Sequence, residues 1–217
     1  MQRFDTLIRP GDTVFDVGGH IGFIAQYFSR KVGDAGQVHV FEPGQRNQLF
    51  LRQNIACRRN CAHVDAAVSD RPGKATFFEE NVGGFMNSLD ADFARSSDIA
   101  RAQRASLQIT PHQVWTTTLD IYASRHGLMP DFIKIDVEGA ELAVLRGAAD
   151  MLAQTRALMV EVARDKDAVF DLLSDAGFSL TSETGAAITA ADQMQGNVFG
   201  TRQETATDAR PQPRDQM

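Results

Sequence analysis

Residues 11–23 read GDTVFDVGGHIGF, and this stretch decides the fold. The apolar run at its centre is typical of a buried strand, and the residues after its glycines follow a helical pattern of apolar side chains. Gly18 and Gly22 let a ligand and the following helix approach the backbone closely. A turn between a strand and a helix also presents backbone N–H groups and the positive end of the helix. The stretch therefore predicts a strand–helix unit with a binding site at its turn.

The rest of the chain repeats this alternation of short apolar runs and longer amphipathic patterns. We expect strands at residues 13–18, 37–43, 63–69, 131–138 and 157–163. Apolar residues spaced three and four apart predict helices at residues 21–33, 45–59, 141–154 and 165–177. Strands that alternate with helices in this way are the signature of an α/β fold built on a parallel sheet.

A long connection separates the third and fourth of these strands. It contains an expected extra strand at 74–80, a glycine-containing segment at 81–90 and a helical pattern at 92–105, and a strand running into a helix follows at 114–127. Such an insertion is either a substrate-binding element or a plain surface excursion. Within it, Asn87 and Ser88 either hydrogen-bond a substrate or belong to a solvated turn.

The end of the chain completes one domain. Residues 178–183 and 197–202 are expected to close the sheet as an antiparallel pair. The following residues have almost no apolar content, which is typical of disorder. We therefore expect a single domain over residues 1–202 and a disordered tail over residues 203–217.

Composition narrows the class of partner. The formal net charge is −6, and no dense run of Lys and Arg provides the basic surface that nucleic acids require. No apolar run reaches the length of a membrane span, and the N-terminus has no signal-peptide pattern. We expect a cytoplasmic protein that acts on a small molecule, without nucleic acid as a partner. The sequence indicates neither its oligomeric state nor the identity of that small molecule.

The glycine turn and an acidic residue beyond it suggest a nucleoside-bearing cofactor. A nicotinamide fingerprint needs G-x-G-x-x-G, but counting from Gly18 the later glycines are replaced by His20 and Phe23. Glu42, at the end of the second strand, is placed to accept hydrogen bonds from a ribose diol. Asp16, just before the glycines, suits a ligand with an ammonium group, such as the methionine part of S-adenosylmethionine.

The motifs GDTVFDVGGHIGF, VHVFEP, TTTLD and DFIKIDVEGAELAVLRGA together resemble the FkbM family of S-adenosylmethionine-dependent methyltransferases. This resemblance implies a Rossmann-like class I methyltransferase fold, with helices on both faces of a mainly parallel seven-stranded sheet whose last strand is antiparallel. It implies transfer of a methyl group from S-adenosylmethionine to an oxygen of a small molecule, sugar or secondary metabolite. The cofactor residues that it implies are Asp16, Gly18, Gly19, His20, Gly22, Glu42 and Ala67, with Ala67 near the adenine.

Three ionisable residues stand in the expected fourth strand. Alternation along a strand places Lys134, Asp136 and Glu138 on one face, so Lys134 can stabilise the two carboxylates. We expect Asp136 or Glu138 to position or deprotonate the acceptor hydroxyl. The alternative is that both carboxylates only pair with Lys134 and interact with the positive N-terminal end of the next helix. Glu161 could join them around a divalent cation, but without a matched ligand spacing we expect no required metal.

Two other functions stay open at this point. One is an NAD-dependent oxidoreductase or epimerase, which the replaced glycines disfavour. The other is a catalytically silent module that binds the cofactor but turns over no acceptor. Acidic residues at both the cofactor and the acceptor positions favour the methyltransferase.

Overall fold

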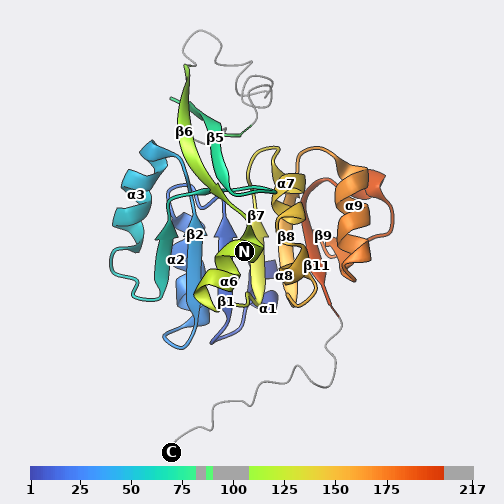
Figure 1. The fold of residues 1–217 in the computed structure, drawn as a ribbon. Helices are drawn as coiled ribbons and strands as arrows, with labels where there is room; N and C mark the ends of the chain where they lie inside the picture. The colour runs from blue at the N-terminus through green and yellow to red at the C-terminus, as the bar shows by residue number, and fades with distance from the viewer. Residues whose placement is uncertain (82–86, 90–107, 203–217) are drawn as a thin grey trace, which may run out of the picture.

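The computed structural model describes residues 1–81, 87–89 and 108–202. An eight-stranded sheet in the order β10-β9-β11-β8-β7-β1-β2-β3 forms the centre of the molecule (Figure 1). Its strands are β1 (Thr13–Val17), β2 (Gln37–Phe41), β3 (Cys61–Val64), β7 (Phe132–Ile135), β8 (Ala157–Val162), β9 (Ser179–Ser182), β10 (Ala187–Ile188) and β11 (Gly196–Thr201). The strands from β8 to β3 are parallel, and β11 is antiparallel to both β8 and β9.

This topology confirms the expected mainly parallel sheet and its antiparallel closing pair. The sheet has eight strands in place of the seven implied by the resemblance, because the two-residue strand β10 pairs with β9 at its edge. The order also places β7 directly beside β1, so the turns that follow these two strands lie next to each other. In a doubly wound sheet, this reversal of strand order is where ligands bind.

Helices cover both faces of the sheet because the strand residues alternate between two apolar cores. Phe15 and Ile133 belong to the core under α6, α7, α8 and α9, whereas Val14 and Phe132 belong to the core under α1, α2 and α3. The helices are α1 (Gln2–Leu7), α2 (Phe23–Val32), α3 (Gln45–Ile55), α6 (Leu119–His126), α7 (Glu141–Arg146), α8 (Ala149–Leu152) and α9 (Lys166–Asp175), with a 3-10 turn η1 (Ala191–Gln193).

A second, three-stranded sheet corrects the expected third strand. Residues 63–69 do not form one strand: β3 ends at Val64, and β4 (Ala67–Val68) belongs to the sheet β4-β6-β5 with β5 (Gly73–Glu80) and β6 (Ile109–Thr117). Figure 1 shows β5 and β6 projecting beyond the end of the main sheet. The insertion therefore builds a wall beside the carboxyl ends of the parallel strands.

The expected helix at 141–154 is also divided, into α7 and α8. The division falls at Gly147, where an added Cβ would lie 2.2 Å from the carbonyl oxygen of Ser69. The close approach of another chain segment therefore requires glycine at this position. In contrast, the expected strand running into a helix at 114–127 is confirmed as the end of β6 and α6. The side chain of Thr118 caps this helix by accepting a hydrogen bond from the Ile121 N–H.

Some expectations lie outside the part of the chain that the structure describes. The helical pattern at 92–105 and the tail at 203–217 fall entirely on such residues, and the glycine-containing segment at 81–90 does so for the most part. Among the described residues, no helix combines the length and the apolar character needed to cross a membrane.

Candidate functional site

A cavity of about 210 Å³ lies where the turns after β1, β2 and β7 meet the second sheet. Its walls come from six chain segments. The lining residues are Val17, Gly18, Gly19, His20, Phe23, Ile24, Phe41, Glu42, Pro43, Ala66, Ala67, Val68, Phe77, Asn87, Leu89, Lys134, Asp136, Val137, Glu138 and Ala140. Seven of the nine residues predicted for the cofactor or the acceptor, namely all except Asp16 and Gly22, therefore line one cavity.

The glycine turn touches the backbone of the β7 turn. A Cβ added to Gly18 would lie 1.8 Å from the carbonyl oxygen of Asp136, and the φ angle of 79° at this residue also favours glycine. A Cβ added to Gly19 would lie 2.1 Å from a methyl group of Val40. Gly22 does not line the cavity. It directly precedes α2 and permits this end of the helix to pack closely on Leu51 of α3. The glycines therefore hold the β1 turn against its neighbours.

Glu42 lies at the end of β2, and backbone donors fix its carboxylate. The His20 N–H donates to Oε2 and the Gly44 N–H donates to Oε1, each at 2.8 Å. The side chain is 4% exposed, and burial raises the pKa of Glu42 to about 7. The hydrogen bonds from Gly44 and His20 lower the pKa, but they do not outweigh burial. The cavity thus contains a rigid carboxylate that changes charge near neutral pH.

Asp16 lies beneath the cavity and is completely buried. Its carboxylate Oδ1 is 3.2 Å from the ammonium group of Lys134, which also lies 3.3 Å from Asp136 and donates to the carbonyl oxygen of Gly18 at 2.9 Å. Burial alone would lower the pKa of Lys134, but the charges of Asp16 and Asp136 outweigh burial and raise it. Lys134 therefore supplies the fixed positive charge at the centre of the site.

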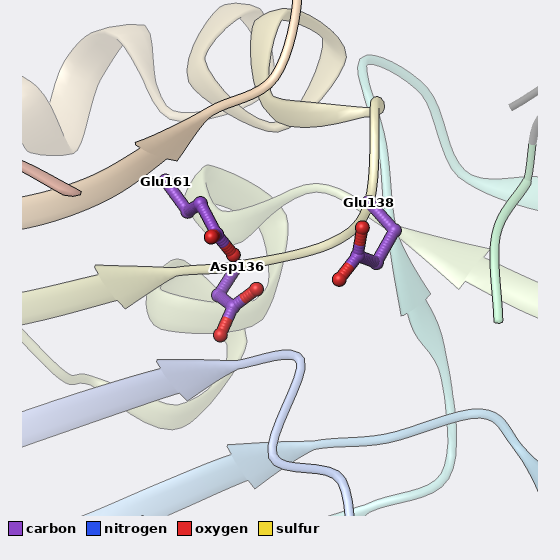
Figure 2. A group of neighbouring side chains, drawn as sticks. All are labelled: Asp136, Glu138 and Glu161. Atoms are coloured by element: carbon purple, nitrogen blue, oxygen red, sulfur yellow. The ribbon is translucent and has the colours of Figure 1, made fainter. Parts of the chain in front are cut away.

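Asp136, Glu138 and Glu161 form an acidic cluster next to Lys134 (Figure 2). Figure 2 shows the carboxylates of Asp136 and Glu161 facing each other, while Glu138 approaches from the loop after β7. Burial opposes the ionisation of Asp136, but Lys134 and the hydrogen bond from Glu161 outweigh it, so the pKa of Asp136 is lowered. The same hydrogen bond, together with burial, raises the pKa of Glu161 to about 8. At neutral pH these two residues share one proton.

Glu138 differs from the other two carboxylates. Burial first, and then the charges of Asp136 and Glu141, raise the pKa of Glu138 to about 7. Its backbone has a φ of 51°, and His20 across the cavity has a φ of 49°. Positive φ values are uncommon for residues other than glycine and concentrate at functional sites. The predicted strand at 131–138 is too long, because β7 ends at Ile135. The alternation of side chains along a strand therefore does not determine the direction of the Glu138 side chain.

One oxygen from each residue of the acidic cluster lies within 4.8 Å of the others, which is close enough to hold a metal ion. Hard cations such as Mg²⁺ prefer carboxylate ligands. However, the Lys134 ammonium already lies 3.3 Å from Asp136, and Glu161 already shares a proton with it. An ammonium and a proton therefore offset the negative charge that a cation would otherwise neutralise.

The apolar wall of the cavity was only partly predicted. Ala67 lines it as expected, but from β4 of the second sheet and not from the end of the third parallel strand. Phe77 and Leu89 complete this wall, and sequence patterns did not indicate them because their contribution depends on how the second sheet docks. Asn87 and Ser88 are buried, so the expectation of a solvated turn was wrong for these two residues.

Comparisons with known proteins identify related chains. A family profile described as the methyltransferase FkbM domain matches residues 16–180. The chain is 31% identical over 206 residues to the 31-O-demethyl-FK506 methyltransferase FkbM of Streptomyces tacrolimicus, covering 83% of this chain and 78% of that protein. It is 29% identical over 165 residues to the 2-O-methyltransferase NoeI of Sinorhizobium fredii, covering 74% of this chain and 67% of that one.

Solved structures share the fold. Methyltransferase FkbM from Methylobacillus flagellatus superposes with a TM-score of 0.55 and 13% identity, over 92% of this chain and 50% of that one. The present chain therefore spans about half the length of that protein. Fibrillarin from Aeropyrum pernix, solved with natively bound S-adenosyl-L-methionine, gives a TM-score of 0.51 at 15% identity over 90% of this chain and 68% of that one.

Proposed function

The chain belongs to the FkbM family of methyltransferases, and from this premise we propose that its cavity binds S-adenosylmethionine and methylates a hydroxyl oxygen of a small molecule or sugar. The sulfonium of this cofactor supplies an activated methyl group, which an oxygen nucleophile takes by in-line displacement of the sulfur. The observation that carries the proposal is the position of Glu42, which lies in the same cavity as the carboxylates of the β7 turn.

The residues of the cavity fit the parts of this cofactor. Glu42 offers carboxylate oxygens for the ribose hydroxyls, and the apolar surfaces of Ala67, Val68 and Phe77 suit the adenine ring. Gly18 and Gly19 leave room for the chain that joins the ribose to the amino acid end. Asp16 is too deeply buried to line the cavity, so we assign it an indirect part, which is to hold Lys134 in place.

We assign the role of general base to Glu138. It lines the cavity, and a base whose pKa is near 7 is suited to accept a proton at neutral pH. With the cofactor bound, the Glu138 carboxylate would accept the proton of the acceptor hydroxyl as its oxygen takes the methyl group. Asp136 stays ionised beside Lys134 and orients the hydroxyl, because its lowered pKa makes it a weak base.

The cavity edge indicates where an acceptor approaches. Phe23, at the start of α2, lines the cavity although 68% of its surface is exposed. An exposed aromatic ring beside a polar centre offers an apolar face on which a sugar ring or a hydrophobic metabolite can rest. The names of the two relatives both refer to methylation at an oxygen, which agrees with a hydroxyl as the acceptor group.

Binding calorimetry tests the cofactor assignment. We expect the protein to bind S-adenosylmethionine and S-adenosylhomocysteine but not NAD, and the Glu42→Gln variant to bind both sulfur compounds more weakly. S-adenosylhomocysteine at 100 times its dissociation constant should stabilise the protein by about 2.7 kcal/mol. For a chain of this length, the unfolding midpoint should then rise by roughly 5 to 10 °C. Tight binding of NAD alone would refute the assignment and favour an oxidoreductase.

The affinity for S-adenosylhomocysteine should depend on pH. The raised pKa of Glu42 means that the side chain loses its proton as the pH rises through about 7, and only the carboxylate accepts hydrogen bonds from both hydroxyls. Below the pKa, affinity should therefore increase by about tenfold for each pH unit, and above it affinity should level off. Calorimetry from pH 5.5 to 8.5 measures this slope. A slope that persists in Glu42→Gln would contradict the assignment.

A further inference from the structure

Residues 87–89 form a short segment that is fastened between β5 and the β7 turn. The Phe78 N–H donates to the Ser88 carbonyl at 2.8 Å, and the Ser88 N–H donates back to the Phe78 carbonyl at 3.1 Å. On the other side, the Ser88 hydroxyl donates to the carbonyl of Glu138 at 2.7 Å. These bonds hold the neighbouring Asn87 at the wall of the cavity.

The amide of Asn87 has a defined orientation. Its Oδ1 accepts a hydrogen bond from the Glu80 N–H at 2.9 Å, so the oxygen must face β5 and the NH₂ group must face the opposite way. Asn87 is only 8% exposed, yet Nδ2 has no hydrogen-bond partner within the described residues. A buried donor without a partner is costly, and such groups commonly await a ligand or water.

Asn87 and Glu42 line the same cavity. A Cβ added to Gly44 would lie 3.0 Å from Asn87 Nδ2 and 2.7 Å from Glu42 Oε1. Both polar atoms therefore lie beside the Cα of Gly44, where any larger residue would displace them. A hydroxyl group is complementary to this pair, since its oxygen can accept from the amide while its hydrogen is donated to the carboxylate.

We propose that Asn87 binds the cofactor ribose, donating from Nδ2 to one hydroxyl whose proton Glu42 accepts. This inference rests on the proposed function, because it requires a nucleoside in the cavity. It gives the inserted second sheet a direct part in cofactor recognition. The four bonds that fix residues 87 and 88 set the amide in place before the ligand arrives, so little ordering is needed on binding.

Two substitutions distinguish the loss of the Asn87 Nδ2 donor from a general disturbance of the folded structure. Asn87→Asp keeps an oxygen for the Glu80 N–H but replaces the donor with a second carboxylate oxygen next to Glu42, whereas Asn87→Ala removes the whole amide. Calorimetry with S-adenosylhomocysteine should give about 10- to 100-fold weaker binding for Asn87→Ala. Asn87→Asp should bind more weakly still at pH 8, where both carboxylates are charged. Gln113→Ala, an exposed change in the same hairpin, should bind normally.

Deoxy analogues of S-adenosylhomocysteine identify the bond itself. The analogue that lacks the contacted hydroxyl, 2′-deoxy or 3′-deoxy, should bind the wild type weakly and should lose no further affinity in Asn87→Ala. Equal losses for the parent compound and both analogues would overturn the inference, because Asn87 would then act only on the shape of the cavity. Unchanged affinity in both Asn87 variants would also overturn it.

The Glu42→Gln variant distinguishes failure of the inference about Asn87 from failure of the proposed function. If Glu42→Gln weakens binding while both Asn87 variants bind normally, the inference about Asn87 fails and the proposed function stands. If the wild type binds neither sulfur compound, both fail. Unfolding midpoints measured without ligand at about pH 5 should be similar for Asn87→Asp and the wild type, since the buried carboxyl is then protonated and the bond from Glu80 is kept.

Discussion

Replacing Lys134 with methionine should lower the free energy of unfolding by about 3 to 5 kcal/mol, because the change leaves the carboxylate of Asp16 buried without its partner. Asp16 has no exposed surface, so water cannot replace the ammonium group. For a chain of this length, the thermal midpoint should fall by roughly 6 to 20 °C. Differential scanning calorimetry without ligand measures this directly.

A partly exposed lysine provides the matched control. Lys31 pairs with Asp5 at 3.1 Å, almost the same distance as Lys134 to Asp16, but the two side chains of that pair are 29% and 53% exposed. Lys31→Met should therefore leave the midpoint almost unchanged. The double variant Lys134→Met with Asp16→Leu should recover part of the loss, since both buried charges are then removed. Equal midpoints for Lys134→Met and Lys31→Met would contradict the view that Lys134 holds the site together.

The second large effect is expected at Glu138. Glu138→Gln should reduce turnover by about 10²- to 10⁴-fold, because the amide cannot accept the proton of the acceptor hydroxyl. Affinity for S-adenosylhomocysteine should stay close to that of the wild type. Turnover at saturating cofactor should also rise with pH through about 7 and then level off, since Glu138 has a raised pKa and acts only when ionised. The variant should lose this rise.

Release of S-adenosylhomocysteine measures turnover, with acceptors taken from a screen of sugars and hydroxylated metabolites. Glu183→Gln is the matched control: it is the same substitution on an exposed side chain that does not line the cavity. Its turnover should stay near that of the wild type. If chelation of divalent cations abolished wild-type turnover and Mg²⁺ restored it, the acidic cluster would be a cation site, and the role of Glu138 as base would be wrong.

Local patterns in the sequence predicted the parts of the fold that depend on hydrophobic periodicity. The units built on β1, β2 and β7 follow from apolar runs that end at glycines or acids, and the meeting of their turns follows from strand order. The division between β3 and β4 was missed because apolar residues stand at 64 and at 66–68, on both sides of Asp65, and no glycine or proline marks the bend.

The features of the site that were missed depend on contacts between distant segments. The sequence indicated that Lys134 faces Asp136, because strand alternation is local, and the structure confirms this contact. It did not indicate that Asp16 pairs with Lys134, since this depends on the register of β1 beside β7. Likewise, the burial of Asn87 depends on the second sheet docking beside the cavity. Tertiary packing, not local propensity, determines these positions.

The bond from Lys134 to the Gly18 carbonyl, with the ion pair to Asp16 next to it, joins residues more than 100 positions apart. During synthesis, β1 leaves the ribosome long before β7 does. Until β7 has been made, the Lys134 ammonium group is not available to pair with Asp16 in the apolar core. We therefore expect the ionised form of Asp16 to become stably buried only when β7 has docked beside β1, and contacts of such long sequence separation form slowly. The pairing that neutralises Asp16 thus links the two halves of the chain in folding as well as in the site.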